Sequence, residues 1–243
     1  MMTGQERKYA ILTHILDDYV REGKGIRQRR SYFDDSTPER QNQARARAFL
    51  RLCLASTCGV LDFEEREKTS TDESYDGGIE AYFIDTENKV LDIIQSKFRI
   101  GSNNFESKII SPEEIMAIDL DRILSGNRQS ASGINYNGRI LAFIEKWQKI
   151  QDVARYTTKI TILANVKEEQ YCLVERLFPQ DQTNIVNFDR CYGNLVMPTI
   201  RGEQHYKSSM RLHIDLSNKS NNSKLSAEIN TAYGPSQVTV VLV

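Results

Sequence analysis

The segment that most constrains the fold runs from Tyr75 to Arg99 and reads YDGGIEAYFIDTENKVLDIIQSKFR. Two runs rich in apolar residues flank TENK, residues 86–89, an arrangement typical of antiparallel strands joined by a four-residue connection. In the resulting register Asp85 lies opposite Val90. Each earlier residue of the first strand then lies opposite the next later residue of the second strand. Both faces of this hairpin carry apolar side chains, so both need cover from other elements. We therefore expect the hairpin to lie inside the fold and not on its surface.

The same register gathers polar residues at the end of the hairpin away from the turn, because residues opposite one another, or two apart along a strand, share a face. The polar residues on this face are Asp76, Glu80, Gln95 and Lys97. Toward the turn the same face becomes apolar, with Tyr82, Ile84, Leu91 and Ile93, and the other face carries Ile79, Ala81, Phe83, Val90 and Ile94. Burying polar groups costs free energy unless they are paired or hold a ligand. Gly77 and Gly78 would let a metal, a water or a phosphate approach the backbone closely.

These groups suit metal-assisted phosphodiester hydrolysis. Carboxylate and carbonyl oxygens are the hard ligands that Mg²⁺ prefers, and a bound metal polarises a phosphate and activates water. A neighbouring lysine can orient or deprotonate that water, or stabilise the developing charge. The structural alternative is that Asp76 caps a turn and that Lys97 forms an ordinary ion pair with Glu80.

Patterns outside the hairpin predict helices interleaved with strands. Apolar residues recur at helical spacing in residues 6–22, and Thr37, Pro38 and Gly59 are typical of the cap, first turn and end of a second helix. The acidic segment 62–76 is expected to be mainly loop. Further helices are expected at residues 111–126, 140–150 and 167–178, and further strands at residues 159–165, 185–188, 211–216 and 238–243. These elements predict an α/β fold, of the α+β kind with a mixed sheet.

The whole chain has 243 residues and a net charge of −1, so its overall charge does not favour nucleic acid. No apolar run approaches the roughly 18 residues of a membrane span, and the N-terminus lacks a secretory pattern. Four cysteines without a CxxC pair fit a reducing, cytoplasmic compartment. The apolar strand at 238–243 either pairs inside the sheet or is followed by further residues in the natural chain.

The N-terminal quarter is locally basic. Its arginines include Arg21, Arg27, Arg29, Arg30, Arg40, Arg45, Arg47 and Arg51. They form either a solvated helix face or a surface that contacts phosphates, and the second alternative assigns nucleic-acid binding to Arg27, Arg29 and Arg30. Arg99, just beyond Lys97, is a further candidate for a phosphate contact.

The stretch DGGIE…IIQSKFR resembles the PD-(D/E)XK nuclease superfamily, in the Mrr-like branch where glutamine replaces the glutamate of ExK. It is most similar to the N-terminal nuclease-like region of the abortive phage infection (AIPR) family, whose members carry DGGID…IQSKY. The close similarity covers Tyr75 to Arg99, and a looser one extends from Arg40 to the strand at 159–165.

The resemblance implies a restriction-endonuclease-like domain spanning residues 1–243. Residues 1–60 would be its helical, basic part, 75–170 its nuclease core, and 171–243 would add strands. It implies Asp76 as the principal ligand of Mg²⁺ or Mn²⁺, Gln95 and the Ser96 carbonyl as further ligands, and Lys97 as the catalytic lysine. Glu80 would support the site. The family's glutamate on the helix before the hairpin has no counterpart: Glu39 lies too early and Glu64 or Glu65 too late to replace it well, whereas Asp72 or Glu73 could reach the site.

Three functions remain at this point. The first is a metal-dependent DNA endonuclease in restriction or phage defence, for which a homodimer would supply two active sites. The second is a nucleic-acid-binding module that keeps the fold with weakened or lost catalysis. The third is an interaction domain without a nucleic-acid partner, and RNA stays open as a substrate because nothing here recognises a 2′-hydroxyl.

Overall fold

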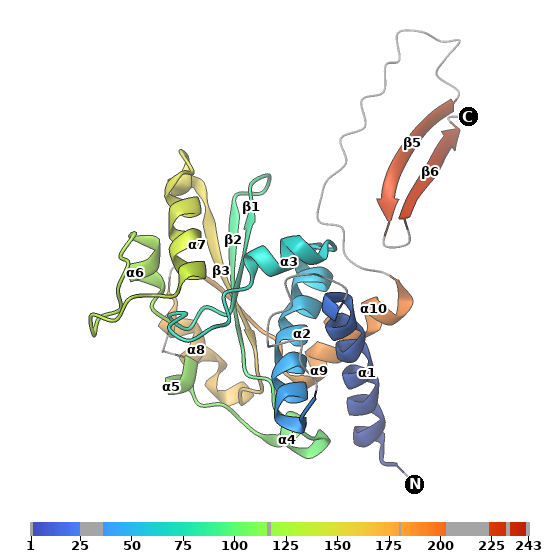
Figure 1. Cartoon of the computed structure of the whole chain (residues 1–243), viewed down its shortest axis with the longest axis horizontal. Coiled ribbons are helices and arrows are strands. Elements are labelled where there is room, and N and C mark those ends of the chain that lie inside the picture. Colours follow the sequence, from blue (N-terminus) through green and yellow to red (C-terminus); the bar gives the residue numbers. More distant parts are fainter. Residues whose placement is uncertain are drawn as a thin grey trace.

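The computed structural model describes residues 2–24, 36–115, 118–179, 181–202, 224–231 and 234–241. At its centre is a four-stranded mixed sheet with the strand order β1-β2-β3-β4 (Figure 1). The strands are β1 (Ala81–Asp85), β2 (Val90–Ser96), β3 (Thr157–Leu163) and β4 (Gln182–Ile185). The pair β1–β2 is antiparallel, whereas β2–β3 and β3–β4 are parallel. The predicted mixed α/β fold is confirmed.

Helices precede the hairpin and connect the parallel strands. The α-helices are α1 (Gly4–Lys24), α2 (Pro38–Cys58), α3 (Phe63–Thr69), α4 (Ser102–Ser107), α5 (Pro112–Ile115), α6 (Leu120–Leu124), α7 (Gly138–Gln148), α8 (Tyr171–Leu177), α9 (Phe188–Cys191) and α10 (Met197–Arg201). Short 3₁₀ segments lie at η2 (Val153–Arg155) and η3 (Glu168–Gln170), and a π-helical segment at η4 (Tyr192–Val196).

Each face of the sheet has its own hydrophobic core. On one face α1 and α2 pack against Ala81 and Ile94, and on the other α6 and α7 pack against Tyr82 and Ile93 (Figure 1). The rings of Tyr82 and Phe143 of α7 stack with their centroids 4.2 Å apart. The hairpin is therefore covered on both faces, as its two-sided apolar pattern predicts.

Local capping signals set the ends of the long helices. The Thr37 side chain accepts a hydrogen bond from the Arg40 N–H at 3.3 Å, and Pro38 is the first residue of α2. Gly59 ends α2 in the left-handed conformation, with φ 68°. At the start of α7 the Asn137 side chain accepts from two backbone N–H groups. The predictions for residues 6–22 and 37–59 are confirmed.

Two sequence predictions in the middle of the chain are wrong. Residues 63–69 form α3 and not a loop, because the Asp62 side chain caps the helix by accepting from the Glu65 N–H. The described part of 111–126 contains α5 and α6 instead of one helix. Asp119 precedes α6 in a non-helical conformation, and its N–H donates to the Gly77 carbonyl at 2.8 Å. This long-range contact takes the place of a helical one.

The C-terminal part departs from the expected series of strands. The strand predicted at 185–188 is β4, which ends at Ile185, and Phe188 begins α9. The helical segments α9, η4 and α10 were not predicted. The strand expected at 211–216 lies outside the described residues. β6 (Gly234–Val241) pairs with β5 (Lys224–Thr231) in a separate two-stranded sheet, and not inside the four-stranded one.

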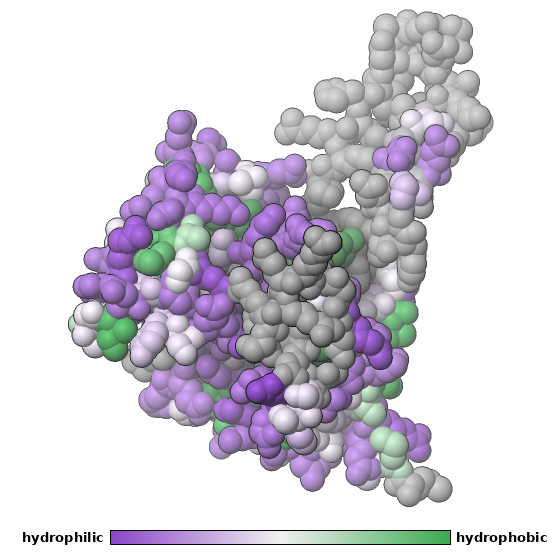
Figure 2. All heavy atoms as spheres, viewed as in Figure 1, coloured by the Kyte–Doolittle hydropathy of each residue, from purple (hydrophilic) through white to green (hydrophobic). Residues whose placement is uncertain are grey.

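The described surface is mostly polar on the face shown in Figure 2, where hydrophobic side chains gather only in small separate groups. Among the described residues, no helix combines the length and the apolar character needed to cross a membrane.

Candidate metal-binding and catalytic site

The predicted register of the hairpin is confirmed from Ala81, opposite Ile94, to Asp85, opposite Val90. Before Ala81 the pairing shifts, because the Glu80 N–H donates to the Ile94 carbonyl at 3.0 Å and not to its register partner Gln95. A one-residue shift of this kind is the geometry of a β-bulge, and it reverses the face of the residues beyond it. Ile79 accordingly packs in the same core as Tyr82, and not with Ala81 as the simple register predicts.

Beyond the bulge the chain forms a closed loop, residues 71–80, which we call the acidic loop because it carries Asp72, Glu73, Asp76 and Glu80. The Thr71 and Asp72 N–H groups both donate to the Glu80 carbonyl, at 2.9 and 3.1 Å. At the tip, Asp76 Oδ1 accepts from the Gly78 N–H at 2.9 Å. The four carboxylates therefore belong to one loop whose two ends are joined by hydrogen bonds.

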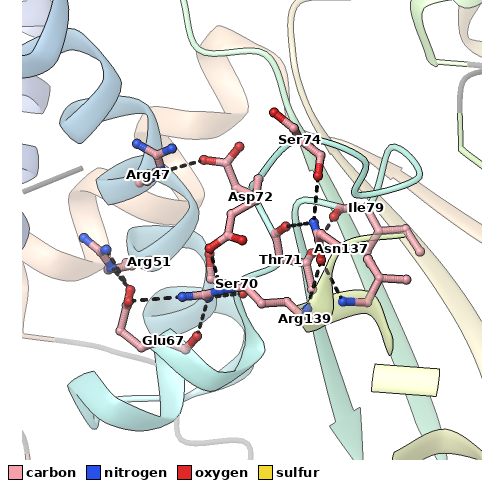
Figure 3. Close-up of polar contacts among 12 residues, drawn as sticks. Arg47, Arg51, Glu67, Ser70, Thr71, Asp72, Ser74, Ile79, Asn137 and Arg139 are labelled. Carbon is pink, nitrogen blue, oxygen red and sulfur yellow. Dashed lines mark hydrogen bonds and ion pairs between the residues drawn. The ribbon is translucent and has the colours of Figure 1, made fainter. Parts of the chain in front are cut away.

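Asn137, the residue that caps the start of α7, holds the acidic loop in place (Figure 3). The Asn137 side-chain amide donates to the carbonyls of Thr71 and Ser74, at 3.2 and 3.4 Å. The backbone N–H of Asn137 donates to the Tyr75 carbonyl at 3.0 Å. Asn137 thus caps its own helix and fixes the loop at three points.

Two arginines add ion pairs to this arrangement (Figure 3). Arg139 of α7 donates to the carbonyls of Glu67, at 2.8 Å, and of Ser70, and its Nε lies 3.1 Å from a Glu73 oxygen. Arg47 of α2 pairs with Asp72, with Nε 2.9 Å from Oδ2. The acidic loop is therefore braced from α2, α3 and α7, although its sequence predicts only a polar connection.

Gly77 does not leave room for a ligand as the sequence suggests. A Cβ at this position would lie 2.7 Å from Ile123 Cδ1 and 3.1 Å from Tyr136 Cε1, and φ is +64°. The glycine is required for close packing and for a backbone conformation that L side chains rarely adopt.

Replacing Gly77 by alanine is expected to lower the free energy of unfolding by about 1–3 kcal/mol, through steric conflict and backbone strain. Gly138→Ala is the matched control, because no atom lies within 4 Å of its Cβ position, and its stability should be unchanged or slightly raised. Urea unfolding of both variants measures the difference. Equal stabilities would contradict the packing assigned to Gly77.

The candidate residues on β2 are deeply buried. Gln95 is 1% exposed, and its Oε1 accepts no hydrogen bond from any described residue. The Ser96 N–H donates to Glu80 Oε2 at 2.9 Å, while Lys97 Nζ lies 3.4 Å from Glu80 Oε1. Glu80 therefore spans the end of β2 and links its backbone to the lysine.

Burial and like charges raise the pKa values of two carboxyl groups in the loop. Burial, with a smaller contribution from Asp72, raises the pKa of Asp76 to about 6, against opposing effects of the Gly78 N–H and Lys97. Burial also raises the pKa of Glu80 to about 8, reinforced by Asp72 and Asp76 and opposed by Lys97. The structure thus brings together the predicted residues Asp76, Glu80 and Lys97, and adds Asp72 to them.

The raised pKa of Glu80 predicts a pH-dependent stability. Its pKa is about 8 in the fold and 4.5 as the ordinary value, so the folded protein retains a proton that the unfolded chain has released in between. The contribution of Glu80 to the free energy of unfolding is therefore fully present below about pH 4.5 and is lost as pH rises through about 8. Glu80→Gln should remove this dependence.

Relative to wild type, Glu80→Gln is expected to gain about 1–3 kcal/mol of stability between about pH 5 and about pH 9. Urea unfolding of both proteins at the two pH values provides the measurement. A difference between them that does not change with pH would contradict the assignment.

The sequence also allows a purely structural role for these residues, and both contacts expected from that role are present. Asp76 caps its turn through the Gly78 N–H, and Lys97 pairs with Glu80. The described residues contain no group of three or more His, Cys, Asp or Glu side chains that could hold a metal. The expected ligand set is different in kind, since it combines one carboxylate, an amide oxygen and a backbone carbonyl. The buried Gln95 Oε1, an acceptor without a donor, fits such a set.

The arginines expected to contact phosphate are mostly engaged or undescribed. Arg27, Arg29 and Arg30 lie outside the described residues. Arg99 lies 3.5 Å from a Glu114 oxygen, and it lines a small pocket with Lys97 and Lys108 beyond the carboxyl ends of β2 and β3.

Elsewhere in the N-terminal quarter, described arginines pair with acids of the same chain. Arg45 donates to both oxygens of Asp17, at 2.7 and 2.8 Å. Arg51, only 2% exposed, binds Glu67 of α3 at 2.7 Å. These two side chains brace the helices through ion pairs within the chain.

No protein-family model, curated protein or solved structure matches the chain.

Proposed function

We propose that the protein is a divalent-metal-dependent endonuclease that hydrolyses phosphodiester bonds of DNA, with a role in restriction or phage defence. Asp76, Gln95 and the Ser96 carbonyl would hold Mg²⁺ or Mn²⁺. Lys97 would act on the attacking water, and Glu80 would position Lys97.

The observation that carries the proposal is the buried amide oxygen of Gln95. It is 1% exposed and lacks a donor among the described residues. An unsatisfied buried acceptor costs about 1–3 kcal/mol, and a cation at this point would offset that cost. Glu80 and Lys97 lie at the same end of β2, and Asp76 lies within electrostatic range of Lys97. Carboxylates beside a lysine are the chemistry that a hydrated magnesium and a phosphate require.

When bound, the cation would polarise a phosphate oxygen and lower the pKa of a coordinated water. Lys97 is 30% exposed on its side chain, so its ammonium group is accessible from solvent while it remains beside Glu80. It can orient the water or stabilise the charge that develops on the phosphate. Lys97, Arg99 and Lys108 line one pocket, and this concentration of positive charge suits a phosphate backbone passing the site.

The second candidate is a nucleic-acid-binding domain with weakened or lost catalysis. It is favoured by Arg47 of α2, whose guanidinium group neutralises Asp72, the nearest additional carboxylate. Salt-dependent binding of DNA without cleavage distinguishes this candidate from a nuclease.

The proposal is tested by incubating the wild-type chain with duplex DNA, single-stranded DNA and RNA in Mg²⁺, in Mn²⁺ and in EDTA. A nuclease of the proposed kind cuts DNA with either metal and not in EDTA. Cleavage that persists in EDTA would reject the metal mechanism. Binding without cleavage under every condition would establish the second candidate in its place.

A further inference from the structure

The residues near Asp76 include candidates for a second acidic ligand of the proposed metal. Magnesium is usually bound in proteins by one or two carboxylates together with waters and substrate oxygens. Glu80 is already bound to the Ser96 N–H and Lys97, and the remaining acids of the acidic loop besides Asp76 are Asp72 and Glu73.

The contacts of Asp72 and Glu73 differ, and they favour Asp72 as the second ligand. The carboxylate of Glu73 lies 3.1 Å from Arg139, the side chain that also braces Ser70 and Glu67. Asp72 lies directly beside the candidate site, because its N–H donates to the Glu80 carbonyl at 3.1 Å.

Asp72 is turned toward α2 in this structure, where Arg47 Nε lies 2.9 Å from its Oδ2 (Figure 3). The Asp72 and Arg47 side chains are 31% and 21% exposed. Both side chains remain partly exposed, so solvent screens the ion pair and a divalent cation can compete for the carboxylate.

From this arrangement we infer that Asp72 is the second carboxylate ligand of the metal and that Arg47 competes with the metal for it. The inference rests on the proposed function, because it assumes that Asp76 and Gln95 hold a cation. The unsatisfied Gln95 Oε1 independently indicates a ligand at this end of β2. Arg47 is then a positioning residue that holds the Asp72 carboxylate toward α2 while the metal is absent.

The two roles predict opposite effects on metal affinity. Mn²⁺ binding to the full chain is measured by electron paramagnetic resonance of free Mn²⁺, without DNA and therefore without turnover. Asp72→Asn should weaken binding about tenfold or more, as loss of a charged ligand does. Arg47→Gln should tighten binding about three- to fivefold, since the competing ion pair is lost.

Two further proteins serve as controls. Glu73→Gln removes the neighbouring charge in the same loop and should leave Mn²⁺ affinity unchanged. In the double variant Arg47→Gln/Asp72→Asn, the tightening caused by Arg47→Gln should vanish, because its target is gone. Thermal unfolding of each variant reports whether the fold is retained, and Arg47→Gln tests the inference with Asp72 intact.

The outcomes separate this inference from the proposed function. If Asp76→Asn abolishes Mn²⁺ binding while Asp72→Asn binds as wild type does, Asp72 is not a ligand and the inference fails alone. If Arg47→Gln weakens Mn²⁺ binding, Arg47 does not compete with the metal for Asp72, and the role inferred for Arg47 is overturned. If the wild-type chain binds no Mn²⁺, the proposed function and the inference both fail.

Discussion

Replacing Lys97 by alanine is expected to reduce metal-dependent cleavage of DNA by about 10²-fold or more, the usual effect of losing a positioned proton-transfer group. The expectation rests on where the ammonium group lies. Its Nζ is 3.4 Å from Glu80, at the end of β2 that also carries the unsatisfied Gln95 amide. Initial rates of supercoiled-plasmid nicking in Mn²⁺ measure the effect.

Two control variants distinguish catalysis from structure. Lys97→Arg keeps the positive charge and can keep the pair with Glu80, but a guanidinium cannot act as a base and has a different shape. It should therefore fold normally and remain slow. Lys68→Ala removes an exposed lysine of α3 and should cleave as wild type does. Full activity of Lys97→Ala would remove Lys97 from the mechanism.

Replacing Glu67 by alanine is expected to lower the free energy of unfolding by about 3–5 kcal/mol, the cost of removing one partner of a buried ion pair. Glu67 Oε1 accepts from Arg51 Nε and Nη2, at 3.0 and 2.7 Å, and Arg51 is 2% exposed. The same carboxylate lies 3.8 Å from Arg139. Its loss would therefore disturb both the junction between α2 and α3 and the brace of the acidic loop.

Urea unfolding of Glu67→Ala against Glu65→Ala measures this effect. Glu65 is an exposed residue in the first turn of the same helix, so its replacement controls for helix propensity and net charge. A difference between the two variants of under about 1 kcal/mol would mean that Arg51 is stabilised without Glu67.

The parts of the fold that follow from local signals were predictable from the sequence. The cap of α2 at Thr37 and its end at Gly59 depend on residues within one turn of each terminus. The hairpin register from Ala81 to Asp85 follows from the length of its connection and the alternation of apolar residues. Such features need no knowledge of the rest of the chain.

The misassigned parts depend on contacts between distant residues. The shift that reverses Ile79 arises because Glu80 pairs with both Ile94 and the segment at Thr71. The helix expected at 111–126 is interrupted where Asp119 bonds to Gly77. Neither contact has a signal in the local sequence.

The charged residues show the same limitation. Asp92 in the middle of β2 is 3% exposed and pairs with Lys159 of β3 at 2.8 Å. That pair requires the parallel register of β2 and β3, in which the two residues are direct partners. The ion pairs of the basic N-terminal quarter are equally hidden from the local sequence, since the acids that pair with Arg47 and Arg51 lie in the acidic loop and in α3.

The central claim is that the acidic loop and the end of β2 form a metal-dependent nuclease site. It is tested most directly by supercoiled-plasmid nicking in Mn²⁺ by the wild-type protein and Asp76→Asn, side by side. Asparagine keeps the acceptor that caps the Gly78 N–H and removes only the charge. We expect the wild type to nick the plasmid in Mn²⁺ and not in EDTA. The nicking rate of Asp76→Asn should be lower than that of the wild type by a factor of at least about 10². Equal rates for the two proteins would contradict the assignment of Asp76 and, with it, the site.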